Sequence, residues 1–380
     1  MVKAAGIDAG TKSMDIYGFD DESGDVLIDE AIPRDLVTEK PEIVVEKIKS
    51  VESKFGKFDA IAISSGYGVP LKRAKDAIDE EIRLATFVTD ADVKRRLRII
   101  GLRELMFLFR KSDLNAWFTP GVVHLKTVPS YRKANKIDMG TSDKIYSTVL
   151  AIKDQAERMG IKYSETSFIL VEVGFAYTSA IAVEGGKIVD GVAGTAGFPS
   201  YLSMGFMDSE LAYALINRVD DFSKSLLFSG GAADYAGINP YQLSIEDFVE
   251  LAYKNDRVAE AYKMMMEGII KDVAALMPTV SPREIILSGR FSRVQKFFRD
   301  AKKELEHFLS KFNFEIDVVK LNSRAKVAKE AAEGAAILAN GIANGRYSEI
   351  LDVMKLKDSG GRLFDNVLLP DAIKSKILDW

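Results

Sequence analysis

The chain has 380 residues, a formal net charge of −4 and no cysteine. This length exceeds what one hydrophobic core usually covers, so we expect two domains. The lack of cysteine excludes disulfides and cysteine-ligated zinc or iron–sulfur sites, and the mild acidity argues against nucleic-acid binding.

The N-terminus leads directly into a charged strand, and no apolar run approaches the length of a membrane span. We therefore expect a cytoplasmic protein without a membrane partner. A homodimer is left open.

The first motif is a stretch of small residues at 6–13. A P-loop would continue into a helix, whereas the residues that follow here alternate with the period of a strand. We expect a β-hairpin whose turn presents N–H groups and hydroxyls to phosphate, with its carboxylate holding a hydrated Mg²⁺. The residues assigned to this turn are Asp8, Gly10, Thr11, Lys12 and Ser13. An ordinary hairpin with a surface lysine is the alternative.

Next, Pro41 and an apolar stripe predict a helix that Gly56 closes. A buried parallel strand is predicted at 59–66, and strand ends of this kind carry site loops in α/β folds. The loop Gly66–Pro70 is therefore either a wall of an acceptor pocket or a plain loop.

The basic cluster Lys94–Arg98 is either a solvated face beside a core helix or the source of an arginine that reaches phosphate. A turn is predicted at 117–121 and a strand at 122–125. The single histidine in that strand, His124, is more typical of a core or surface residue than of a catalytic one.

Two aspartates and a lysine surround a glycine just before the next predicted helix. Thr141 or Ser142 can cap that helix, which is the plain interpretation. Phosphoryl transfer, however, needs a carboxylate near the acceptor and a cation near the moving charge. The candidate catalytic residues of this stretch are Asp138, Asp143 and Lys144.

A second copy of the first pattern occupies residues 168–190. Its apolar strand ends in Glu172 and Gly174, where the first copy has Asp8 and Gly10, and two strands follow in each. Two copies of one three-stranded unit imply two related lobes.

Farther along, an apolar strand ends in Ser288, Gly289 and Arg290. A further strand is predicted at 314–318 and an Ala-rich helix at 323–343. The alternation of strands and helices in this half predicts a parallel sheet with covering helices.

Four of these elements, in this order, resemble the acetate and sugar kinase, Hsp70 and actin superfamily. They are the turn at Asp8, its second copy at Glu172, the strand that ends in Gly289 and the Ala-rich helix. The resemblance implies a two-lobed, duplicated α/β fold of the actin-like ATPase (ribonuclease H-like) type, with ATP in a cleft between the lobes. It implies Mg²⁺ at Asp8 and Glu172, an adenosine motif at Gly289 and Arg290, and an Ala-rich helix that crosses between the lobes. More narrowly, the chain resembles an archaeal branch described as predicted butyrate kinases.

Two residues depart from the superfamily's pattern. Glu172 stands where many relatives carry aspartate and acyl kinases carry histidine, so it either coordinates Mg²⁺ through water or positions the attacking group. Arg290 stands where a second glycine is common. Its side chain either contacts adenosine or closes the pocket.

The resemblance implies an N-terminal lobe at 1–165 with an insertion at about 71–145. It implies a C-terminal lobe at 166–345 and an extension at 346–380.

The leading hypothesis is an ATP- and Mg²⁺-dependent kinase of a small acceptor, with a short-chain carboxylate as the best guess. A carboxylate is already nucleophilic, whereas a hydroxyl acceptor would need a base, for which Asp138 is the candidate. The alternative is a non-catalytic or slowly hydrolysing nucleotide switch that acts on a protein partner.

Overall fold

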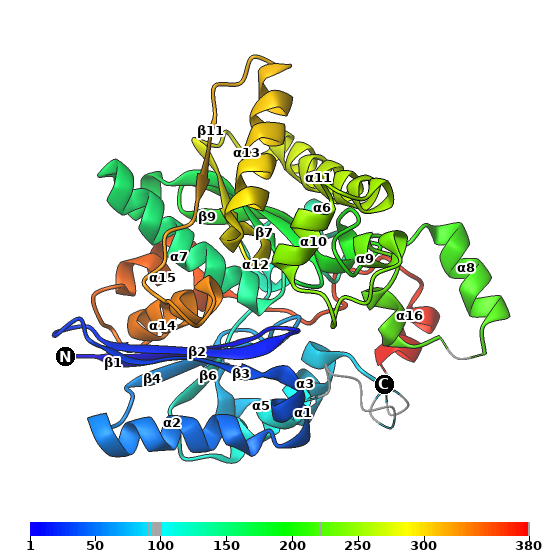
Figure 1. Ribbon diagram of the computed structural model, residues 1–380. Coiled ribbons are helices and arrows are strands. Elements are labelled where there is room, and N and C mark those ends of the chain that lie inside the picture. The colour runs from blue at the N-terminus through cyan, green and yellow to red at the C-terminus, as the bar shows by residue number, and fades with distance from the viewer. Residues whose placement is uncertain (90–91, 93, 95–100, 221, 379–380) are drawn as a thin grey trace. The chain divides into compact units, whose positions relative to one another are not determined.

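A computed structural model describes residues 1–89, 92, 94, 101–220 and 222–378. The chain forms two compact units, which are described separately (Figure 1). Unit 1 comprises Met1–Thr166, Gly185–Val189 and Asn322–Trp380, and unit 2 comprises Ser167–Glu184 and Asp190–Leu321.

Unit 1 contains a six-stranded sheet in the order β3-β2-β1-β4-β6-β5. Its strands are β1 (Lys3–Ala9), β2 (Ser13–Asp20), β3 (Val26–Pro33), β4 (Ala60–Ile63), β5 (Lys72–Arg73) and β6 (Ala116–Phe118). The first three form an antiparallel meander, and β4 and β6 continue parallel to β1. The predicted hairpin is confirmed, because Ala9 pairs with Met14 on either side of the turn.

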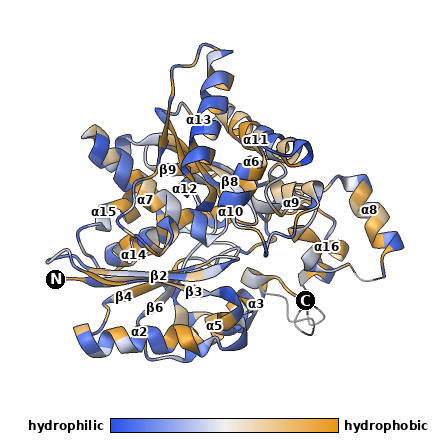
Figure 2. Ribbon diagram, in the orientation of Figure 1, coloured by the Kyte–Doolittle hydropathy of each residue, from blue (hydrophilic) through white to orange (hydrophobic). Residues whose placement is uncertain are grey.

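Helices lie on both faces of this sheet (Figure 1). The helices of unit 1 are α1 (Arg34–Glu39), α2 (Glu42–Phe55), α3 (Asp79–Thr86), α5 (Gly101–Lys111), α6 (Ser130–Lys133), α7 (Ser142–Met159), α14 (Glu330–Ile342), α15 (Ser348–Met354) and α16 (Asp371–Leu378). Hydrophobic and hydrophilic residues alternate along α2 in Figure 2, and its Val44, Ile48 and Val51 are buried. This spacing directs one apolar stripe into the core.

Helix α14 packs closely between β1 and α7. A β-carbon on Gly6 of β1 would overlap the backbone of Ala336, and one on Gly334 would overlap the backbone of Tyr146 in α7. Glycine is therefore required at Gly6, where β1 meets α14, and at Gly334, where α14 meets α7. The Ala-rich helix is confirmed but begins at Glu330, later than the predicted start.

Unit 2 repeats the connectivity of unit 1. Its sheet has the order β11-β10-β7-β8-β9, with β7 (Ser167–Val173), β8 (Thr178–Glu184), β9 (Lys187–Ala193), β10 (Glu284–Ser288) and β11 (Asp317–Lys320). Strands β7 and β8 are antiparallel, whereas β10 is parallel to both β7 and β11. The order β9-β8-β7-β10-β11 matches β3-β2-β1-β4-β6, which confirms the predicted internal repeat.

The helices of unit 2 include one long core helix, α11. The helices are α8 (Ser209–Arg218), α9 (Ala232–Ala236), α10 (Ile245–Leu251), α11 (Asp256–Leu276), α12 (Arg290–Arg293) and α13 (Gln295–Ser310). Helix α11 packs on β7 and β8, and its Met265 and Met266 are buried as core residues.

Two local predictions were wrong, and a third was displaced along the chain. The predicted turn at 117–121 contains part of β6, whose Trp117 and Phe118 pair with β4, and the predicted strand at 122–125 contains the 3-10 helix Val122–His124. The expected strand at 314–318 begins later, at Asp317, because Phe314 N still donates to Leu309 O at the end of α13. Short apolar runs do not distinguish a strand from a helical turn.

The boundary of the units also differs from the predicted lobes. Residues 322–345, expected in the C-terminal lobe, belong by their contacts to unit 1, since α14 packs on β1 and α7. Strand β6 lies within the expected insertion but is part of the main sheet. Among the described residues, no helix combines the length and apolarity that crossing a membrane requires.

Candidate functional site

A buried cluster of charges lies at the end of β1 in unit 1. Asp8 is 0% exposed, and Lys329, the residue that precedes α14, forms an ion pair with its Oδ2. Asp15 lies directly opposite Asp8 on β2, with its Oδ2 3.8 Å from Lys329 Nζ. Two carboxylates opposite each other on neighbouring strands repel. Lys329 supplies the positive charge that offsets this repulsion.

The surroundings of Asp8 favour its neutral form. Burial raises the pKa of Asp8 to about 6; Lys329 opposes the rise, and the charges of Asp143 and Asp15 add to it. Among the described residues, Oδ1 of Asp8 has no hydrogen-bond partner. A buried carboxylate oxygen of this kind can take a cation or a further donor.

The turn after β1 packs against two cations. A β-carbon on Gly10 would lie 2.5 Å from Lys329 Nζ, so a larger residue there would displace the end of the lysine side chain. Arg34, the first residue of α1, is buried, and its NH1 donates to Gly10 O at 3.5 Å. Burial lowers the pKa of Arg34 to about 10, with Asp8 opposing the change. Sequence reasoning identified neither Lys329 nor Arg34.

The other residues assigned to the turn have different environments. Ser13 Oγ donates to Asp15 Oδ2 at 2.5 Å, which orients the Asp15 carboxylate. Thr11 is half-buried, and Lys12 is exposed while its carbonyl accepts from Arg34 N at 3.0 Å. A phosphate-binding role for Thr11, Lys12 and Ser13 stays a prediction.

The first turn of α7 contributes two of the predicted catalytic residues to the same cluster. Lys144 Nζ donates to Asp143 Oδ2 at 2.6 Å, and Thr141 Oγ1 donates to Asp143 Oδ1. Burial would raise the pKa of Asp143, but Lys144, Thr141 and Lys329 together hold it below its usual value. Asp143 is therefore an anion that interacts with both members of the Asp8–Lys329 pair.

The N-cap residue of α7 is Thr141, one of the two predicted residues. Thr141 makes no side-chain capping bond, and Ser142 Oγ instead accepts from Ser65 N at 2.8 Å. Ser142 N donates to Gly66 O at 2.9 Å. These bonds fasten the loop after β4 to the start of α7, beside Asp143.

Asp138, the third predicted catalytic residue, lies in the loop before α7 and is buried. It lies near Tyr67: burial raises the pKa of that phenol, and the charge of Asp138 raises it further.

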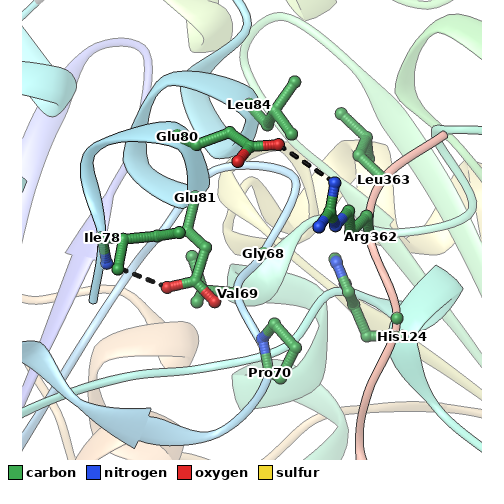
Figure 3. Close-up of a pocket in the computed structure, with 11 residues that line it drawn as sticks. Gly68, Val69, Pro70, Ile78, Glu80, Glu81, Leu84, His124, Arg362 and Leu363 are labelled. Carbon is green, nitrogen blue, oxygen red and sulfur yellow. Dashed lines mark hydrogen bonds and ion pairs between the residues drawn. The ribbon is translucent and has the colours of Figure 1, made fainter. Parts of the chain in front are cut away.

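The loop that contains Tyr67 continues into the wall of a pocket of about 120 Å³. Figure 3 shows loop 68–70, helix α3, His124 and the segment 361–363 around it. Its lining residues are Gly68, Val69, Pro70, Ile78, Glu80, Glu81, Leu84, His124, Gly361, Arg362 and Leu363. Arg362 donates to Glu80 at 3.2 Å across one side.

His124 gives this pocket a hydrogen-bond donor. Its Nδ1 accepts from Gly121 N at 3.3 Å, which in a neutral imidazole places the proton on Nε2. Burial lowers the pKa of His124 to about 4, so the ring is neutral near pH 7. Figure 3 shows the ring pointing toward the space between Pro70 and Arg362.

In unit 2, Glu172 lies on a buried polar stripe. It pairs with Ser179 on β8 and with Ser288 on β10, and directly paired residues project from the same face of a sheet. Glu172, Ser179 and Ser288 are all buried. The second acidic turn is therefore flanked by two hydroxyls.

The predicted adenosine motif contacts this turn within unit 2. Gly289 has φ +88°, and a β-carbon there would lie 2.6 Å from Val173 O, so the position requires glycine. Gly174 N donates to Tyr177 O at 2.9 Å, which closes the turn. Arg290 begins α12 and is half-buried.

The residues present fit a magnesium ion that is bound mainly by other ligands. The described residues include no group of three acidic, histidine or cysteine side chains that would hold a metal alone. Mg²⁺ commonly binds through one or two carboxylates, with water and substrate phosphates completing its shell. Asp8 Oδ1 offers one such ligand. Asp8 belongs to unit 1 and Glu172 to unit 2.

Other predicted cations cannot be placed. Arg95, Arg96 and Arg98 of the basic cluster lie outside the described residues.

A family model described as "Protein of unknown function (DUF1464)" matches residues 6–369. No curated protein matches the sequence.

Three solved structures share the fold at low sequence identity. The acetate kinase of Porphyromonas gingivalis matches with a TM-score of 0.58 and 15% identity over 88% of this chain and 98% of that one. The propionate kinase of Francisella tularensis gives 0.58 and 16% over the same shares. The acetate kinase of Entamoeba histolytica gives 0.54 and 12% over 84% and 96%. The predicted two-lobed, actin-like α/β fold is confirmed.

Proposed function

This chain belongs to the DUF1464 family, and we propose that it is an ATP- and Mg²⁺-dependent phosphotransferase acting on a small acceptor. The observation that carries the proposal is the buried charge cluster at the end of β1. Its members are Asp8, Asp15, Asp143, Lys144 and Lys329. The fold shared with acetate and propionate kinases supports the same class of reaction.

Phosphoryl transfer is catalysed mainly by positioning and by charge stabilisation. In this proposal Asp8 Oδ1 would hold Mg²⁺, which when bound would neutralise charge on the nucleotide phosphates. In the same proposal Lys144, which donates to Asp143, stabilises charge on the acceptor. Both lysines lie in a buried setting, where electrostatic interactions are stronger than in water.

The pocket of Figure 3 is the proposed acceptor site, because loop 64–70 runs from the end of β4, next to β1, into its wall. His124 Nε2–H and Arg362 are donors for acceptor oxygens, and the apolar residues Val69, Leu84 and Leu363 suit a short alkyl chain. A short-chain carboxylate such as butyrate combines both features. With that acceptor, Asp138 is not needed as a base.

Unit 2 carries residues to which the proposal assigns nucleotide contacts of their own. Glu172 and the flanking hydroxyls face a phosphate or its metal, and Gly289 and Arg290 contact adenosine. The guanidinium of Arg290 suits stacking on a base or a bond to ribose.

A nucleotide switch that acts on a protein partner is the second candidate. The observation that favours it is the ion pair of Lys329 with Asp8, because a neutralised carboxylate binds a metal more weakly. A switch would hydrolyse ATP slowly and independently of any small acceptor.

Calorimetric titration with Mg-ATP, followed by an ADP-release assay with acetate, propionate, butyrate and a sugar panel, separates these functions. ATP binding with carboxylate-dependent ADP release supports the kinase. ATP binding without acceptor dependence favours the switch, and absence of ATP binding contradicts both. Asp25→Asn, in the exposed turn between β2 and β3, is a control that should match the wild type.

A further inference from the structure

Residues 323–329 form an irregular segment that leads to the charge cluster. The carboxylates of Glu333 and Asp29 hold this segment by hydrogen bonds. Glu333 Oε2 accepts from Ser323 Oγ at 2.6 Å, from Arg324 N at 2.6 Å and from Ala325 N at 3.0 Å. Glu333 is itself buried in α14. The first half of the segment is thus tied to the helix that it precedes.

Asp29 of β3 fastens the second half. Its carboxylate accepts from three consecutive backbone donors: Lys326 N at 2.7 Å, Val327 N at 3.2 Å and Ala328 N at 2.7 Å. Hydrogen bonds to an ionised acceptor are stronger than neutral ones. The residue that follows these donors is Lys329.

The side chain of Lys329 then lies against the turn predicted to bind phosphate. Its Nζ contacts Asp8 and packs on Gly10, and the side chain is 11% exposed. An anion that binds at this turn would meet the ammonium, which is a compact donor suited to phosphate.

We propose that Lys329 contacts the phosphates of the bound nucleotide and that Asp29 is the positioning residue that sets Lys329 in place. This inference rests on the proposed function, which supplies the nucleotide. The alternative is that Lys329 only neutralises Asp8 and Asp15, in which case its loss would change the binding of any ligand through the fold alone.

The test compares the affinities of Mg-ATP and adenosine by calorimetry on the full chain. Lys329→Met should weaken ATP about tenfold to a hundredfold, the usual effect of losing one charged hydrogen bond, and leave adenosine unchanged. Asp29→Asn should weaken ATP less, because an amide can accept at only one of its two heteroatoms. The double variant Asp29→Asn with Lys329→Met should bind ATP with the same affinity as Lys329→Met alone, since Asp29 acts through Lys329.

Hydrogen exchange of the amides at 326–328 in the nucleotide-free protein checks the positioning step. Asp29→Asn should accelerate this exchange, whereas Glu30→Gln, which removes a charge from an exposed pair with Lys47, should match the wild type in every assay. If Lys329→Met does not fold, Asp29→Asn decides the question by the same two measurements.

Equal losses of ATP and adenosine affinity, additive losses in the double variant, or unchanged amide exchange in Asp29→Asn would overturn the inference while the proposed function stood. Absence of ATP binding by the wild type would instead overturn the proposed function, and the phosphate contact with it.

Discussion

Lys329, next to the first turn of α14, forms an ion pair with Asp8 on β1. The two residues lie far apart in the sequence, yet they meet in unit 1, where Asp8 is fully buried and the Lys329 side chain is 11% exposed. Because Asp15 lies opposite Asp8, the lysine offsets two carboxylates. This pair is the centre of the site and a structural link between the first strand and the Ala-rich helix.

Removing the lysine should destabilise the protein strongly. We expect Lys329→Met to cost about 3–5 kcal/mol of unfolding free energy in urea titrations, because it leaves a buried carboxylate unpaired. Replacing both partners, as in Asp8→Asn with Lys329→Met, should recover most of this loss. Lys47→Met, in an exposed pair with Glu30, should cost less than about 1 kcal/mol. Equal costs for the two lysines would contradict the buried ion pair.

The buried Asp272 of α11 should make stability depend on pH. Burial raises its pKa to about 7, while the bond from Phe198 N opposes the change. The folded state therefore disfavours the ionised form, so the penalty is absent below about pH 4 and complete above pH 7. It amounts to roughly 4 kcal/mol for a shift of about three pH units.

Asp272→Asn should remove this penalty, since its amide oxygen can still accept from Phe198 N. We expect its stability relative to the wild type to rise between pH 4.5 and pH 8 in urea titrations. A difference that stayed constant over this range would show that Asp272 does not titrate in the folded protein.

The contact between α14 and α7 should not tolerate a methyl group. Gly334→Ala improves helix propensity by about 1 kcal/mol, yet its β-carbon would overlap the backbone of Tyr146. We expect a net loss of about 1–3 kcal/mol from overpacking. Gly360→Ala is the control, because no atom of the described residues lies within 4 Å of its β-carbon position. A stabilised Gly334→Ala protein would disprove the close approach of the two helices.

Arg362 should affect the acceptor and not the nucleotide. It lies at the pocket beside Glu80, and its side chain is 63% exposed, so its removal should leave the fold intact. If butyrate is the acceptor, Arg362→Ala should raise the KM for butyrate about tenfold, with little change in the KM for ATP. Steady-state ADP release at varied concentrations of each substrate measures both values. A parallel rise in both KM values would place Arg362 outside the acceptor site.

The sequence predicted the parts of this site whose signals are local. The hairpin around Asp8 follows from alternating residues and small turn residues, and its second copy at Glu172 made the duplicated fold recognisable. Asp138, Asp143 and Lys144 were selected together as charged residues around a glycine near a helix start, and the structure joins the last two at 2.6 Å.

Long-range contacts were not predictable in the same way. Lys329 joins Asp8 only because α14 returns to β1, and no pattern around Lys329 distinguishes it from a surface lysine. The signal that existed was Gly6 on β1 together with the small residues of α14, which together permit close packing. Arg34 was missed because a buried arginine beside a turn has no sequence signature.

The central claim is that Asp8 organises phosphoryl transfer to a small acceptor. The most direct measurement is ADP release from Mg-ATP, with and without short-chain carboxylates, by the wild type and by Asp8→Asn, with circular dichroism to verify that both are folded. The account predicts acceptor-dependent release by the wild type and a loss of at least about a hundredfold in folded Asp8→Asn. Full turnover by Asp8→Asn, or release by the wild type that ignores the acceptor, would contradict it.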